Sequence, residues 1–171
     1  MLNKKIETAI NDQINAEFWS AYLYLSMSMY CANKNLQGAS NWFHIQFKEE
    51  QAHAEKFMAY ILSRGGQVLL QPIAMVDTSW DSLLSAFQAT LAHEKVVTAK
   101  INHIYNLAVE EKDFATQSML NWFIDEQVEE EETAQQMIDT LEMIGDNGYG
   151  LYQFDKELAA RVYVPITAAT E

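Results

Sequence analysis

A glutamate and a histidine lie three residues apart in a polar stretch near one third of the chain. Glu50 and His53 form the pattern E-x-x-H within the run Glu49-Glu50-Gln51-Ala52-His53. Residues three apart share one face of a helix, so a carboxylate oxygen and an imidazole nitrogen can reach the same ion. The same pattern binds paired metal ions in the cores of helical bundles. It does not by itself distinguish a metal site from a solvated helix face, because it also arises by chance.

Three further glutamates fall at the same depth in other predicted helices. Glu17, Glu94 and Glu130, like Glu50, lie about 13 to 16 residues from the expected helix starts. A rise of about 1.5 Å per residue puts each roughly 20–24 Å along a helix of about 45 Å, whichever way the helix points. Four acids at one level repel each other unless they are protonated or neutralised by metal. Coordination to cations resolves this conflict.

Glu94 lies on the apolar stripe of its predicted helix. It follows Leu84, Phe87 and Leu91 at helical spacing, and Ile101 continues the stripe. An unpaired acid in such a position costs on the order of several kcal/mol. We therefore interpret its placement as functional.

Carboxylate oxygens dominate this donor set, and a single imidazole nitrogen completes it. Such a set suits iron or manganese better than copper, or than structural zinc, which prefers cysteine and histidine. Glu50 could bridge two ions. One ion would then be bound by Glu17, Glu50 and His53, and the other by Glu50, Glu94 and Glu130.

Apolar residues at helical spacing predict four long helices that would position these side chains. The chain has only 6 Gly and 2 Pro, which indicates a mostly helical protein. Gly65-Gly66 would end the second helix, and Asp77-Thr78-Ser79 offers an N-cap for the third. We expect the helices at about residues 3–32, 36–63, 80–111 and 114–144.

The link between the second and third helices is long for a compact domain. Residues 66–79 are extended in character, and Pro72 excludes helix there. Such a link can run the whole length of a bundle, whereas a short loop would make its two helices antiparallel neighbours. We therefore expect one all-α domain over residues 1–171, a four-helix bundle at about 3–144 with one long crossover, and a short C-terminal helix at about 151–161.

Composition excludes several classes of partner. The formal net charge of −13 leaves no basic patch for nucleic acid and favours cations instead. Residues 1–7 are followed by no apolar run, so we expect no secretory signal. The most apolar stretch, residues 21–32, is too short to span a membrane. A single cysteine, Cys31, rules out an internal disulfide and fits a reducing cytoplasm, so we expect a cytoplasmic protein.

Taken together, these residues resemble the non-haem bacterial ferritins over essentially the whole chain. The resemblance implies a ferritin-like bundle that assembles into a hollow shell of twenty-four subunits around a ferric mineral. The motifs that carry it are Asn15-Ala16-Glu17, Tyr24, Glu49-Glu50-Gln51-Ala52-His53, His93-Glu94, Trp122, Glu126-Gln127-Val128-Glu129-Glu130 and Gly150-Leu151-Tyr152-Gln153-Phe154-Asp155-Lys156-Glu157-Leu158.

The resemblance also implies roles for particular residues of this chain. Glu17, Glu50 and His53 match the first iron site of the family's ferroxidase centre, and Glu50, Glu94 and Glu130 match the second.

Further residues match positions beside this centre. Gln127 matches a glutamine that hydrogen-bonds the bound oxygen species, and Tyr24 matches a tyrosine that supplies an electron during oxidation. Glu49, Glu126 and Glu129, together with Glu130, match a third iron site that faces the cavity.

Some positions depart from related families. Bacterioferritin has a second E-x-x-H where this chain has Gln127 and Glu130, and its haem methionine is replaced here by Gln51, so we expect no haem. The predicted fifth helix argues against the twelve-subunit mini-ferritins. One cysteine cannot supply the rubredoxin domain that rubrerythrins usually add.

We therefore expect an iron-storage protein that oxidises Fe²⁺ with O₂ or H₂O₂ at a di-iron site. A rubrerythrin-like oxidase or peroxidase without mineral storage would use the same ligands and remains an alternative. A purely structural bundle would need a missing ligand, and none is missing.

Other polar residues have simpler interpretations. We expect Glu131 and Glu132 to belong to a solvated face. His44, His93 and His103 are expected to be structural or exposed, and Tyr24 as a packed core tyrosine remains open.

Overall fold

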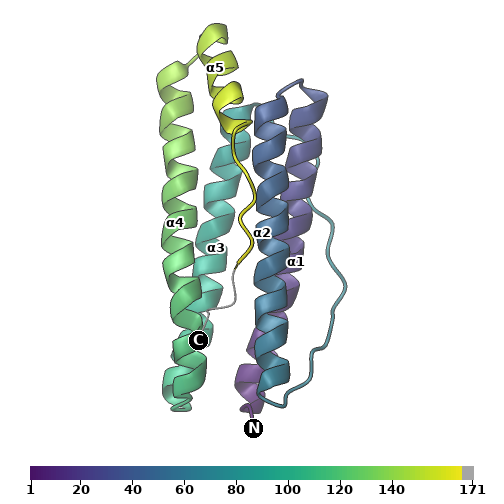
Figure 1. Cartoon of the computed structure of the whole chain (residues 1–171), viewed down its shortest axis with the longest axis vertical. Helices are drawn as coiled ribbons and strands as arrows, with labels where there is room; N and C mark the ends of the chain where they lie inside the picture. Colours follow the sequence, from purple (N-terminus) through teal and green to yellow (C-terminus); the bar gives the residue numbers. More distant parts are fainter. Residues whose placement is uncertain (167–171) are drawn as a thin grey trace.

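Helices account for most of residues 1–166, the part of the chain that the computed structural model describes. Figure 1 shows the long helices side by side along one axis, with a short one at one end. The described residues contain no strand, so the all-α expectation is confirmed. The helices are α1 (Lys4–Asn33), α2 (Gln37–Ser63), α3 (Leu83–Glu110), α4 (Phe114–Ile144) and α5 (Gly148–Leu158).

Polar side chains fix the starts of two long helices where the sequence places them. The Asn3 side chain accepts a hydrogen bond from the Lys5 backbone N–H at 2.8 Å. The Asp113 carboxylate accepts one from the Thr116 backbone N–H at 3.0 Å. Each bond satisfies a backbone donor that the first helical turn leaves without a partner.

The third helix begins later than the sequence predicted. We expected a cap at Asp77–Ser79 and a helix from about Trp80, but α3 begins at Leu83. The Ser82 hydroxyl accepts from the Ser85 backbone N–H at 3.0 Å, and the Ser85 hydroxyl accepts from the Ser82 backbone N–H at 2.9 Å. This reciprocal pair satisfies two donors at once and therefore sets the start.

The fifth helix begins earlier than expected. It was predicted from about residue 151, whereas α5 starts at Gly148. The Asn147 side chain accepts a hydrogen bond from the Gly150 backbone N–H at 3.0 Å, which caps the helix three residues sooner.

The connection between α2 and α3 runs along the bundle, as expected. Figure 1 shows it passing beside α1 from one end of the molecule to the other. Asn11 of α1 binds it at both of its amide atoms, donating to the Gln67 carbonyl at 3.0 Å and accepting from the Leu69 N–H at 2.7 Å. Further along, the Ser26 hydroxyl donates to the Asp77 carbonyl at 2.6 Å. The crossover lets α2 and α3 point the same way, while α1 packs on α2 and α3 packs on α4.

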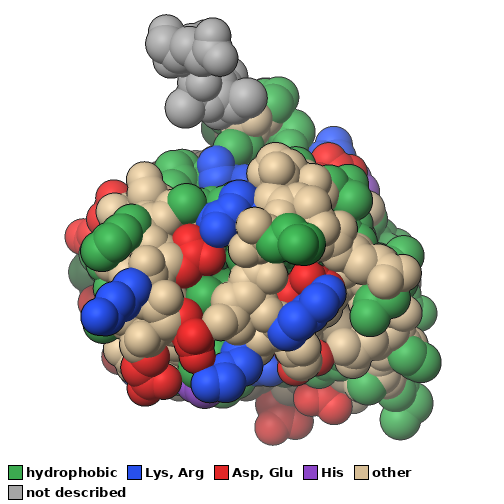
Figure 2. Space-filling view, turned by 90° about the horizontal axis from the view of Figure 1, so that it is seen from below, with side chains coloured by type: hydrophobic (Ala, Val, Ile, Leu, Met, Phe, Trp, Pro, Cys, Tyr) green, Lys and Arg blue, Asp and Glu red, His purple; other side chains and the backbone are tan. Residues whose placement is uncertain are grey.

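Ion pairs join the helices at the end of the bundle where the chain begins. Arg64, just after α2, pairs with Asp113, just before α4, at 3.0 Å. Lys5 of α1 pairs with Glu111, just after α3, at 2.8 Å. Figure 2 shows basic and acidic side chains interspersed on this end.

The apolar core consists of two clusters, one toward each end of the bundle. One contains Phe43 and Phe87, with ring centroids 4.9 Å apart. The other contains Phe57 and Phe123, whose stacked rings are 3.9 Å apart. Buried polar side chains at mid-height lie between the clusters, and they include most of the predicted metal ligands. No helix within residues 1–166 combines the length and the apolar character that crossing a membrane requires.

Candidate metal centre

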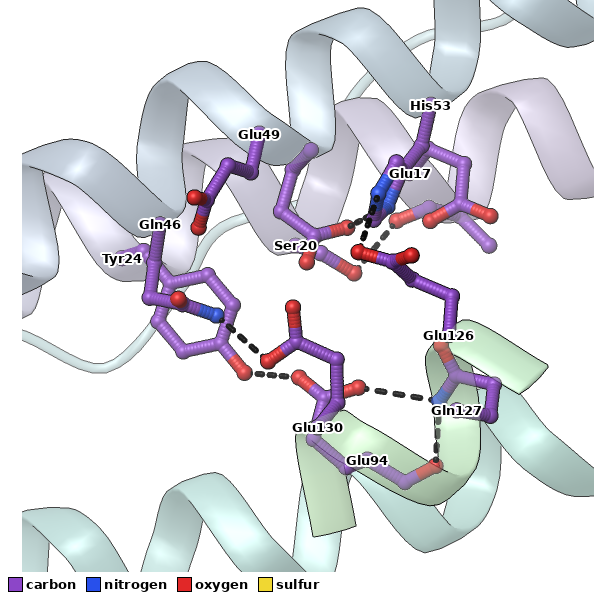
Figure 3. Close-up of polar contacts among 12 residues, drawn as sticks. Glu17, Ser20, Tyr24, Gln46, Glu49, His53, Glu94, Glu126, Gln127 and Glu130 are labelled. Atoms are coloured by element: carbon purple, nitrogen blue, oxygen red, sulfur yellow. Dashed lines mark hydrogen bonds and ion pairs between the residues drawn. The ribbon is translucent and has the colours of Figure 1, made fainter. Parts of the chain in front are cut away.

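The five principal predicted ligands come from all four long helices and are buried at mid-height. Glu17 lies on α1, Glu50 and His53 on α2, Glu94 on α3 and Glu130 on α4. Their exposed fractions are between 1% and 8%. Figure 3 shows the labelled members of this set pointing toward one another in the bundle interior. The geometry thus brings together the side chains that the sequence placed at one level.

Glu17, Glu50 and His53 form the tightest part of this cluster. Each offers one ligand atom, and these atoms all lie within 4.8 Å of one another. His53 Nδ1 is 3.6 Å from Glu50 Oε2. Glu17 Oε2, Glu50 Oε2 and His53 Nε2 are buried without a hydrogen-bond partner. Buried polar atoms are nearly always paired, so free lone pairs aimed into one space fit a bound cation.

Glu94 and Glu130 complete the cluster but are held by neutral donors. The Tyr24 hydroxyl donates to Glu94 Oε1, and the Gln127 amide donates to Glu94 Oε2 at 3.1 Å. The Gln46 amide donates to Glu130 Oε2 at 2.9 Å. Three helices thereby supply donors that position the two acids, and both carboxylates still face the shared interior (Figure 3).

Burial makes these acids bind protons more readily when no cation is present. It raises the pKa of Glu17 and of Glu50 well above 4.5, and in each case neighbouring carboxylates raise it further. Burial and then the charge of Glu94 raise the pKa of Glu130 to about 8. Burial also raises the pKa of Glu94, against the hydrogen bonds from Tyr24 and Gln127. A bound cation would replace protons that the low-polarity interior otherwise keeps on the acids.

The residues matched to a third iron site are less well gathered. Glu126 Oε1 is 3.9 Å from His53 Nε2, so this acid lies beside the first cluster. Glu49 Oε2 instead accepts from Arg161 Nη2 at 2.7 Å, and Glu129 is exposed. Among the described residues, these acids do not form a compact group of ligand atoms of the kind that Glu17, Glu50 and His53 form.

Tyr24 is both a core residue and a neighbour of the cluster. Its side chain is fully buried and stacks on Phe43 at 6.2 Å between ring centroids. Burial and then the charge of Glu94 raise the pKa of its hydroxyl well above 10, so the phenol keeps its proton. His93, expected to be structural or exposed, is half-buried, and its Nε2 lies 2.7 Å from the Ser20 hydroxyl. Burial lowers the pKa of His93 to about 4.

The sequence analysis missed several residues that position the cluster. Gln46 bonds Glu130, and Gln13 donates to Glu17 Oε1 at 2.8 Å. Gln13 lies four residues before Glu17, and Gln46 lies four residues before Glu50. Each glutamine therefore shares a helix face with a predicted ligand, and this spacing could have revealed both. Arg161 gave no such signal, because it is 112 residues from Glu49.

One expectation about the acidic run was wrong. Glu131 is not simply solvated, since it is half-buried and accepts from the Thr98 hydroxyl at 2.6 Å. Thr98 lies on α3 and Glu131 on α4, and the two helices pack closely enough for this hydrogen bond to form. Glu132 is exposed, as expected.

Known proteins are similar to this chain in both fold and sequence. The family model described as a ferritin-like domain matches residues 7–144. The chain belongs to the ferritin family. The bacterial non-heme ferritin of Staphylococcus saprophyticus is 42% identical over 163 residues, covering 95% of this chain and 98% of the relative. That of Staphylococcus aureus strain USA300 is 39% identical over the same shares.

Solved ferritin structures agree with this membership. An engineered closed form of the Archaeoglobus fulgidus ferritin superposes with a TM-score of 0.95 at 42% identity, covering 96% of this chain and all of that one. A humanized archaeal ferritin gives the same TM-score at 43% identity and the same coverage. The predicted resemblance and the predicted ferritin fold are therefore both confirmed.

Proposed function

We propose that this ferritin stores iron and oxidises it at a paired site inside each subunit. Fe²⁺ is the substrate, and the oxidised product passes to a mineral in a hollow shell. The observation that carries the proposal is the buried mid-height cluster, where carboxylates from four helices and one imidazole share an interior space. Unpaired ligand atoms on Glu17, Glu50 and His53 support it further.

The donor set divides naturally into two overlapping groups. Glu17, Glu50 and His53 would hold one iron ion, and Glu50, Glu94 and Glu130 would hold the other. Glu50 lies between the two groups, and its pKa is raised by burial and then by the charges of Glu94 and Glu130. Hard carboxylate oxygens stabilise Fe³⁺ more than Fe²⁺, so this set favours loss of an electron.

The oxidation can be balanced with either oxidant. Each of two Fe²⁺ ions gives up one electron, and the pair reduces O₂ to H₂O₂, or H₂O₂ to water, with uptake of two protons. Buried acids that hold protons before iron enters can release them as it binds. In this two-electron step the protein supplies position, charge and protons, while the two iron ions supply the two electrons.

Tyr24 and Gln127 are the proposed catalytic residues beside the iron ligands. Both donate hydrogen bonds to Glu94, from opposite ends of its carboxylate. This placement supports the roles that the family resemblance gives them, with Tyr24 as an electron donor and Gln127 as a donor to bound oxygen. Glu49, Glu126 and Glu129, with Glu130, are the proposed ligands of a third iron ion on the cavity side.

We further infer that the protein is a homo-oligomer, and we propose twenty-four copies in the shell. The crossover and the adjoining face of α1 expose large apolar side chains, which a neighbouring copy would cover. They are Tyr22, Met29, Leu69, Leu70, Ile73 and Met75. The absence of haem and the cytoplasmic location remain predictions from the sequence.

Aerobic addition of Fe²⁺ tests this function directly. We expect Glu50→Gln to slow oxidation, followed by absorbance, at least about tenfold, because even changes to the partners that orient metal ligands typically cost about 10–100-fold in affinity or activity. Glu132→Gln, which removes an exposed acid, should oxidise iron at the wild-type rate. Rapid oxidation by the Glu50 variant would overturn the proposed site.

Particle size and imaging distinguish storage from the rubrerythrin-like alternative. Wild-type protein should elute as a large shell and, after loading, show an electron-dense core by electron microscopy. A small oligomer that oxidises iron without forming a core would favour the alternative.

A further inference from the structure

Arg161 links the C-terminal segment to the proposed third iron site. It follows α5, where Figure 1 shows the chain turning back beside α2. Its Nη2 donates to Glu49 Oε2 at 2.7 Å. Its guanidinium carbon lies 4.6 Å from the centre of the Trp42 ring, and Nη1 donates to the Trp42 carbonyl at 3.4 Å. The Asn41 amide donates to the Arg161 carbonyl at 3.0 Å, so backbone and side chain are both attached to α2.

The partner of Arg161 is an acid that a metal would need. Glu49 is only partly exposed, with a side-chain exposure of 19%, and Arg161 has one of 26%. A guanidinium on such a carboxylate makes a strong charge-assisted hydrogen bond. It also places a fixed positive charge where a third metal ion would bind. The guanidinium and a metal ion on Glu49 would repel one another at close range, so each weakens the binding of the other.

Arg161 neutralises the charge of Glu49, as a bound metal ion would, but it is part of the chain itself. Glu126 lies beside His53, with Glu126 Oε1 3.9 Å from His53 Nε2, whereas Arg161 bonds Glu49. Arg161 therefore neutralises one predicted ligand of the third site without closing the first two sites. Its charge is available only while residues 159–166 stay against α2.

We propose that Arg161 is an internal competitor for the third iron site, which must leave Glu49 before a metal ion can bind there. The inference rests on the proposed third site of Glu49, Glu126, Glu129 and Glu130. Because coupling is reciprocal, metal at this site loosens the C-terminal segment, and the docked segment weakens metal binding. Arg161 donates to Glu49 and to the Trp42 carbonyl and not to a ligand of the first two sites, so the competition acts on the third site.

Calorimetric titration of the metal-free, full-length protein with Zn²⁺ tests the competition without any redox step. In Arg161→Gln, the third Zn²⁺ should bind at least about fivefold tighter than in the wild type, the lower end of usual coupling strengths. The two stronger sites should keep their affinities. Lys156→Gln removes the same charge from the exposed side of α5 and should match the wild type.

Hydrogen exchange on the wild-type protein supplies a second readout that needs no variant. Backbone amides in residues 159–166 should exchange faster once the third Zn²⁺ is bound, and should not respond to the first two. Equal third-site affinity in Arg161→Gln and wild type would overturn the proposal, as would unchanged exchange. Failure of every form to bind a third Zn²⁺ would also overturn it, while two bound ions would leave the paired iron site standing.

Discussion

Glu94 and Glu130 differ from Glu17 and Glu50 in how their buried charge is managed. The first two accept hydrogen bonds from Tyr24, Gln127 and Gln46. Glu17 receives one bond, from Gln13, and keeps a buried oxygen without a partner. Neutral donors stabilise a carboxylate without competing for its remaining lone pairs. The cluster therefore stays folded without metal and still leaves ligand atoms free to bind it.

Replacing one of these neutral donors by an acid should destabilise the metal-free cluster. Gln127→Glu would place another buried carboxylate against Glu94, at a cost of roughly 3 kcal/mol. For a domain of this size that lowers the melting temperature of the metal-free protein by about 6–12 °C. Saturating Zn²⁺ should recover most of the loss, as differential scanning calorimetry would show.

A matched change on the same helix controls for charge alone. Gln135→Glu adds an acid at an exposed position of α4, where surface substitutions have small effects. Its melting temperature should stay within about 2 °C of the wild type. Equal shifts in the two variants would show that Gln127 does not act through Glu94.

At the scale of elements, α5 docks on the start of α2 by way of a glycine. The N-cap residue of α2, Leu36, supplies no side-chain hydrogen bond. Asp155 of α5 does so instead, accepting from the Ala39 backbone N–H at 2.9 Å. A Cβ on Gly38 would lie 1.5 Å from the Asp155 carbonyl oxygen. The two helices can therefore approach this closely only because residue 38 has no side chain.

Gly38→Ala should accordingly release α5 while leaving the four-helix bundle intact. Hydrogen exchange of residues 148–158 should accelerate at least about tenfold, because α5 can no longer pack against the start of α2. Amides of α1 and α4 should keep their protection. Gly148→Ala is the control, since a Cβ there meets no atom within 4 Å. Unchanged exchange in the Gly38 variant would contradict the close approach.

At the scale of the whole molecule, the protein carries excess negative charge on its surface and in its core. The formal net charge is −13, and the central acids are buried among two apolar clusters. Metal binding relieves repulsion among these acids, since none of the buried charged side chains in residues 1–166 is a lysine or an arginine. We therefore expect iron, the substrate, also to stabilise the bundle when it binds at the proposed centre.

Stability of the metal-free protein should fall as pH rises. Burial, followed by the charge of Glu94, raises the pKa of Glu130 from 4.5 to about 8. Because the folded pKa is the higher one, the contribution of this group is fully present below about 4.5 and is lost as pH rises toward 8. Zn²⁺ should therefore raise the melting temperature more at pH 7.5 than at pH 6.

The variant Glu130→Gln removes the group that titrates. Its metal-free melting temperature should change less between pH 6 and pH 7.5 than that of the wild type. A zinc-induced rise that is larger at pH 6 would contradict the assignment.

The amino-acid sequence by itself determined the helices and the level of the acids. Apolar spacing predicted α4 at the residues where it occurs, and the fixed rise of a helix placed Glu17, Glu50, Glu94 and Glu130 at one height. Local caps were harder to predict, because several polar residues compete for the same turn. Ser82 and Asn147 prevailed over the expected starts since their hydrogen bonds satisfy backbone donors there.

Only the tertiary structure decided which side chains meet across helices. Tyr24 and Glu94 are 70 residues apart, and Gln46 and Glu130 are 84 apart. Arg161 reaches Glu49 only because Gly38 lets α5 dock and the chain then turns back along α2. Spacing within one helix follows from its own geometry, whereas contacts between helices depend on their packing, rotation and crossover.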